Sequence, residues 1–65
     1  MQITVNGQKT EVEVKTLAAF LENCEILDQR IAIELNGEII AKSNFCTTSL
    51  SNGDVLEIVH AIGGG

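Results

Sequence analysis

Apolar and polar residues alternate near the N-terminus, which is the period of a β-strand with one buried face. The alternating stretches are residues 2–6 and 10–14, and Asn6-Gly7 between them is a strong hairpin signal. We therefore expect a β-hairpin at the start of the chain. The residues expected to face the core are Ile3, Val5, Val12 and Val14.

The hydrophobic period changes from two to about 3.6 after Thr16, which predicts one helix of roughly three turns. Thr16 is a suitable N-cap residue because its side-chain oxygen can accept from the first free N–H groups. The apolar stripe at spacing i, i+3, i+4 and i+7 consists of Leu17, Phe20, Leu21 and Cys24. This position predicts that Cys24 is a small core residue rather than a redox or catalytic thiol.

A second hairpin is predicted by alternation over residues 31–35, the turn Asn36-Gly37 and a short arm over residues 38–40. Residues 41–51 lack a clear period and are rich in Ser, Thr and Asn, so we expect a loop, with a helical turn near residues 43–45.

A final strand is predicted over residues 55–62, after a turn at Asn52-Gly53-Asp54. This strand is apolar on both faces, which favours a central position in the sheet, beside the first strand. The chain then ends in Gly63, Gly64 and Gly65.

The predicted element order is β-β-α-β-β-β, with a mixed sheet covered on one face by one main helix. That order is typical of an α+β domain with the β-grasp, or ubiquitin-like, fold. We expect one such domain over residues 1–62, followed by a flexible glycine tail over residues 63–65. At 65 residues the chain has no room for a second domain.

Composition and charge narrow the classes of partner. Nine acidic residues against four basic ones give a formal net charge of -5, and two phenylalanines are the only aromatic residues. Nucleic-acid binding is therefore not expected. The first residues lack the basic and apolar regions of a signal peptide, and no apolar run approaches a membrane span, so we expect a cytoplasmic protein that makes no membrane contact.

The glycine tail is the candidate reactive group. A C-terminal carboxylate on Gly65 is ionised at neutral pH, and glycine lacks a Cβ, so Gly63 and Gly64 can thread a slot too narrow for side chains. Taken alone, such a run is also typical of a frayed chain end. Extended, residues 61–65 span up to roughly 17 Å, which would project the carboxylate away from the folded body.

The outer face of the last strand is the candidate docking surface for a partner. If Leu56 and Ile58 face the core, alternation turns the opposite face outward. The outward residues are then Val55, Glu57, Val59 and Ala61. The alternative is that neighbouring segments of the chain cover this apolar strip.

The remaining chemistry-bearing residues do not form a recognisable site of their own. Two cysteines are too few for an iron–sulfur cluster, and Cys24, Cys46 and His60 lack the spacing of a zinc site. Cys46 lies in the polar loop, and His60 is expected at the end of a strand. The acidic pairs Glu11/Glu13 and Glu22/Glu25 look like solvated faces rather than acid/base dyads. We expect no catalytic residue, metal or bound cofactor in this chain.

The sequence resembles the ThiS family, the sulfur carriers of thiamine thiazole biosynthesis, over its whole length. The resemblance is carried by the segment Asn52-Gly53-Asp54, the apolar strand with Glu57 and the terminal glycines. It is also carried by Thr16-Leu17-Ala18-Ala19-Phe20-Leu21 and by Asn36-Gly37-Glu38. Phe45 stands where the family often has tryptophan, and Ala41 where it often has proline. The chain length suits this family better than the similar molybdopterin-synthase sulfur carriers.

The resemblance implies a carrier whose terminal carboxylate is activated by other proteins. An E1-like adenylyltransferase would use Mg-ATP to adenylate Gly65, and a persulfide or equivalent donor would convert the adenylate to a thiocarboxylate. Thiazole synthase would then receive the sulfur. Alternatives are a sulfur carrier for molybdopterin or cysteine synthesis, a modifier conjugated to lysine amines, and a non-covalent ubiquitin-like binding module with inert glycines.

Overall fold

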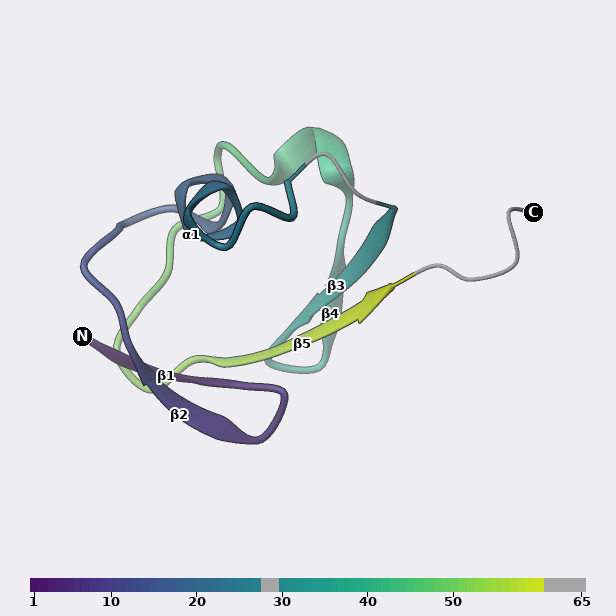
Figure 1. The fold of residues 1–65 in the computed structure, drawn as a ribbon. Helices are drawn as coiled ribbons and strands as arrows, with labels where there is room; N and C mark the ends of the chain where they lie inside the picture. The colour runs from purple at the N-terminus through teal and green to yellow at the C-terminus, as the bar shows by residue number, and fades with distance from the viewer. Residues whose placement is uncertain (28–29, 61–65) are drawn as a thin grey trace.

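The computed structural model describes residues 1–27 and 30–60, which form a five-stranded mixed sheet with one main helix on one face (Figure 1). The elements in chain order are β1 (Gln2–Val5), β2 (Gln8–Glu11), α1 (Leu17–Asn23), β3 (Ile31–Leu35), β4 (Glu38–Ile40), the 3-10 helix η1 (Lys42–Asn44) and β5 (Val55–His60). The strand order is β2-β1-β5-β3-β4, so the last strand is central. β5 runs parallel to β1 and antiparallel to β3, as the β-grasp prediction requires.

Both predicted hairpins form around two-residue Asn-Gly turns. The backbone φ angle is 49° at Asn6 and 84° at Gly7, and it is 52° at Asn36 and 86° at Gly37. Positive φ at both central residues matches the right-handed twist of the flanking strands, and Asn and Gly adopt it at low cost. The two turns therefore set the strand registers from local sequence alone.

The second arm of the first hairpin differs from the prediction. β2 covers Gln8–Glu11, directly after the turn, whereas alternation predicted an arm over residues 10–14. Val12 is still buried, and its N–H donates to the carbonyl of Met1 at 2.8 Å, but it lies just past the strand. Register is set by the turn length, which pairs Val5 with Gln8 and so starts the strand earlier.

The helix begins at the predicted cap and ends earlier than predicted. The Thr16 hydroxyl oxygen accepts a hydrogen bond from the Ala19 N–H at 3.2 Å. The helix has seven residues, about two turns, because Glu25 adopts a φ of 61° and turns the chain away. Cys24 is consequently the C-cap residue and is exposed, so the prediction of a core cysteine is wrong.

The loop after β4 is held by the N-terminus of α1. The N–H groups of Leu17 and Ala18 donate to the carbonyls of Thr48 and Phe45 at 2.9 and 3.0 Å, and the Leu50 N–H donates to Lys15. The bonds from Leu17 and Ala18 use helix N–H groups that have no partner inside the helix. The segment is thus ordered without periodicity, and η1 begins one residue before the predicted helical turn.

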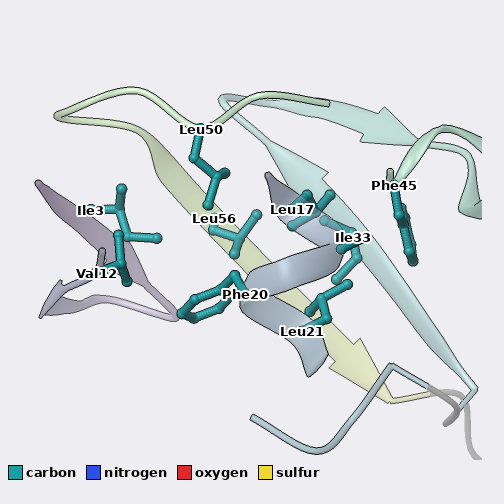
Figure 2. Packing of buried hydrophobic residues seen from close by; sticks show 10 residues of the cluster. Ile3, Val12, Leu17, Phe20, Leu21, Ile33, Phe45, Leu50 and Leu56 are labelled. Atoms are coloured by element: carbon teal, nitrogen blue, oxygen red, sulfur yellow. The ribbon is translucent and has the colours of Figure 1, made fainter. Parts of the chain in front are cut away.

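The core lies between α1, the loop and the inner face of the sheet (Figure 2). Its fully buried side chains are Ile3, Leu17, Leu21, Ile33 and Leu56. Phe45 and Leu50 complete it from the loop, where alternation could not identify them as core residues. Figure 2 shows Leu56 of β5 among these side chains, so the strand that leads to the C-terminus is fixed to the core.

No helix within residues 1–27 and 30–60 is both long and apolar enough to cross a membrane.

Candidate functional site

The strand that precedes the glycine tail is held from both sides. On one side β5 pairs with β3 over five positions, from Leu35↔Leu56 to Ile31↔His60. On the other side it pairs with β1 at only two positions, Thr4↔Val55 and Val5↔Leu56. The backbone is therefore paired with β3 as far as His60, the last residue of β5.

The tail itself lies outside the described residues. This applies to the predicted reactive residue Gly65, to the predicted threading residues Gly63 and Gly64, and to Ala61 of the predicted docking surface. Their roles stay predictions, and the described part of the site is the strand that leads to them.

Side chains alternate along β5 as predicted. Leu56 is fully buried and Ile58 is half-buried, whereas Val55, Glu57 and Val59 are exposed. The exposed fraction is 44% for Val55 and 60% for Val59, which is large for valine side chains in a central strand. Among the described residues no segment covers them, so the alternative that neighbouring parts of the chain bury the strip is wrong for Val55, Glu57 and Val59. Their predicted role in docking stays a prediction.

The exposed surface extends beyond β5 onto the second hairpin. Val59 pairs with Ala32 of β3, and Ile39 of β4 has 76% of its side chain exposed. A shallow hollow of about 280 Å³ on this face is lined by Ala32, Ile33, Glu34, Ile39, Glu57 and Val59. The hairpin residues Ala32, Glu34 and Ile39 were not among the predicted docking residues. The alternation in β3 could have identified two of them, because Ala32 and Glu34 alternate with the inward residues of the same strand.

Two carboxylates lie opposite each other in this surface. Glu34 and Glu57 are directly paired across β3 and β5, and both are exposed. Like charges at such a pair destabilise the sheet slightly. The surface therefore combines exposed aliphatic side chains with two adjacent negative charges, and a cationic group on a partner would relieve their repulsion.

The other candidate residues do not line this hollow. Cys46 is exposed, as its loop position suggested, and His60 is exposed at the end of β5. The four glutamates in the pairs Glu11/Glu13 and Glu22/Glu25 are also exposed, which agrees with solvated faces. Within residues 1–27 and 30–60 no three His, Cys, Asp or Glu side chains gather into a metal site.

Comparisons with known proteins agree over almost the whole chain. The model of the ThiS family matches residues 3–65. The chain is 31% identical over 65 residues to the sulfur carrier protein ThiS of Bacillus subtilis (strain 168), covering all of this chain and 98% of that protein. It is also similar to the crystal structure of a thiamine biosynthesis protein, ThiS, from Geobacter metallireducens, with a TM-score of 0.86, 29% identity and complete coverage of both chains.

One relative is much longer. A thiazole synthase of Paramagnetospirillum magneticum is 35% identical over 66 residues, which cover the whole chain but only 20% of that protein. The chain thus spans about a fifth of the length of this relative, so a segment similar to it occurs within a thiazole synthase polypeptide.

Proposed function

The chain belongs to the ThiS family, and from that premise we propose that it is a sulfur carrier of thiamine biosynthesis whose sulfur is held on the carboxyl carbon of Gly65. The observation that carries the proposal is the family match through residue 65, together with a central β5 that leads directly to the tail. The protein is a carrier rather than an enzyme. In this proposal its partners supply the catalytic groups.

Activation of the carboxylate comes first, because a carboxylate is a poor electrophile. A Gly65 carboxylate oxygen attacks the α-phosphorus of Mg-ATP on an E1-like adenylyltransferase. A P–O bond forms, the bond between the α- and β-phosphates breaks, and pyrophosphate leaves. ATP and magnesium are thus bound by the activating enzyme, and this chain needs no cofactor of its own.

Sulfur transfer follows on the acyl-adenylate. A persulfide of the donor attacks the carboxyl carbon, so that a C–S bond forms and AMP leaves, giving an acyl disulfide. A second thiol then attacks the donor sulfur of this acyl disulfide. A new disulfide forms between that thiol and the donor sulfur, the original S–S bond breaks, and the Gly65 thiocarboxylate is released. The two cysteines of this chain are exposed and unpaired, which fits a reducing, cytoplasmic setting for thiol chemistry.

Thiazole synthase is the acceptor that we propose for this sulfur. The support is that a similar segment forms about a fifth of a thiazole synthase polypeptide, which brings carrier and acceptor into one molecule in that relative. A carrier for molybdopterin or cysteine synthesis would use the same tail chemistry with another acceptor.

The exposed face of β5 is the docking surface that we propose for the activating enzyme. Its described residues are Val55, Glu57 and Val59, and the hollow extends it to Ala32, Glu34 and Ile39. Ala61 remains a predicted member that lies outside the described residues. Ordering the three glycines costs on the order of 3–6 kcal/mol, at about 1–2 kcal/mol per residue. Contacts on the folded body must offset this cost, so the tail alone would be a poor substrate.

Intact-mass analysis of the protein tests the proposal. Incubated with its activating enzyme, Mg-ATP and a sulfur donor, the protein should gain the mass difference of one sulfur replacing one oxygen at Gly65. Deletion of Gly65 should abolish the gain while leaving the fold unchanged. Lysine-linked adducts would instead identify a conjugated modifier, and a terminus that is never modified would identify an inert binding module.

A further inference from the structure

The asparagines of the two Asn-Gly turns both reach β5 with their side chains. The Asn6 Oδ1 accepts a hydrogen bond from the Ile58 N–H at 2.7 Å, and its Nδ2 donates to the Ile58 carbonyl at 3.3 Å. The Asn36 Oδ1 accepts from the Val55 N–H at 2.9 Å. The turn from β1 to β2 thus contacts β5 two residues before its end, and the turn from β3 to β4 contacts its first residue.

The Asn6 side chain continues the pairing of β1 with β5 where the backbone pairing stops. The last backbone pair is Val5↔Leu56, and the Asn6 N–H donates to the Leu56 carbonyl at 2.9 Å. The next N–H and C=O of β5 that face this side belong to Ile58. A side-chain amide offers the same donor and acceptor as a peptide group, and Asn6 uses both on Ile58.

We propose that Asn6 is a positioning residue for the transfer reaction, because it holds the tail-proximal end of β5 on the side that β1 leaves unpaired. This inference rests on the proposed function of Gly65 as the sulfur-carrying residue. Without the Asn6 amide, the described backbone of β5 beyond Leu56 would keep its pairing with β3 alone. The end of β5 would then be less constrained in direction. Each encounter with the activating enzyme would therefore have to order the residues after β5.

The turn itself does not require this side chain. Glycine adopts positive φ without a Cβ penalty, so Asn6→Gly preserves the turn conformation while it removes both hydrogen bonds. Asn36→Gly is a matched control, because Asn36 has nearly the same φ, also precedes glycine and also bonds a β5 amide, but at the start of the strand. Asn6→Asp keeps the acceptor for the Ile58 N–H and loses the donor.

Amide hydrogen exchange measures the local effect independently of any partner. In Asn6→Gly, the Ile58 amide should exchange about two- to tenfold faster than in the natural protein, the range expected for one ordinary hydrogen bond. In Asn36→Gly the increase should fall on Val55 and spare Ile58. Asn6→Asp should keep the Ile58 amide near its natural rate. An unchanged Ile58 amide in Asn6→Gly would overturn the proposal.

ATP–pyrophosphate exchange with the activating enzyme measures the consequence for the tail. Because the docking face is untouched, Asn6→Gly should lower kcat about two- to tenfold with little change in KM, in proportion to the lost hydrogen bonds. Asn36→Gly, at similar thermal stability, should leave kcat within twofold. Equal kcat values for the two glycine variants would overturn the positioning role. Absence of exchange with the natural protein would instead contradict the proposed function, while the Ile58 result would still test the hydrogen bonds.

Discussion

Replacing Val59 with aspartate tests whether the exposed face of β5 binds the activating enzyme. Val59 lies in the central strand with 60% of its side chain exposed, and it lines the hollow with Ile39. Complete burial of a valine side chain is worth about 1.5–3 kcal/mol. Covering the exposed fraction should therefore contribute about 1–2 kcal/mol to docking, or a factor of roughly 5–30 in affinity.

The expected result is a rise of at least about fivefold in the KM of the carrier for the activating enzyme, with a smaller change in kcat. The introduced carboxylate would also have to be desolvated beside Glu57, so the apolar estimate is a lower bound. The fold should persist, because an exposed strand position tolerates aspartate at a cost of up to about 1 kcal/mol. ATP–pyrophosphate exchange gives KM and kcat, and thermal unfolding monitors the fold.

Two variants separate docking from charge and strand preference. Gln8→Asp adds the same charge to an exposed position in β2, which β1 separates from β5, and it should leave KM unchanged. Val59→Thr keeps the β-branched shape and should have an intermediate KM. A folded Val59→Asp variant with the natural KM would refute the assignment of this face as the docking surface.

Two further predictions concern the core and the charge of the surface. Leu56→Ala removes a fully buried side chain from the central strand and should lower the free energy of unfolding by about 2–5 kcal/mol. A 65-residue domain has only about 3–10 kcal/mol in total, so urea unfolding should show a largely destabilised protein, and a loss below about 1 kcal/mol would contradict the packing. Glu34→Gln removes the repulsion with Glu57 and should stabilise the fold by about 0.2–1 kcal/mol, while it raises KM and weakens its dependence on salt. A lower KM would argue against a cationic partner group.

The hairpins and the start of the helix could be predicted because their determinants are local. Asn6-Gly7 and Asn36-Gly37 form the expected turns, and Thr16 caps the helix through a bond to a residue three positions away. The exposure of Val59 also followed from alternation. For the turns and the cap the controlling interaction spans only a few residues, so the sequence pattern was sufficient. For Val59 the pattern identified the face of the strand, and the exposure also requires that no other described segment covers that face.

Cys24, Phe45 and Leu50 could not be placed from periodicity. Cys24 continues the apolar stripe but follows the last residue of the helix. The helix ends there because Glu25 adopts a positive φ, which a glutamate in the sequence does not predict. Phe45 and Leu50 are buried because their segment bonds to the first turn of α1, and this contact joins residues about thirty positions apart.

The sequence by itself determined the element order, the apolar character of the last strand and the glycine tail that follows it. These properties depend on hydrophobic period, turn chemistry and the absence of a Cβ, all of which are local. The tertiary structure decided which exposed residues form one surface and how β5 is held. Ile39 and Val59 share a face only because the sheet order places β3 between their strands. Asn6 meets Ile58 across 52 positions because β1 and β5 are parallel neighbours, and a long-range pairing of this kind leaves no trace in local periodicity.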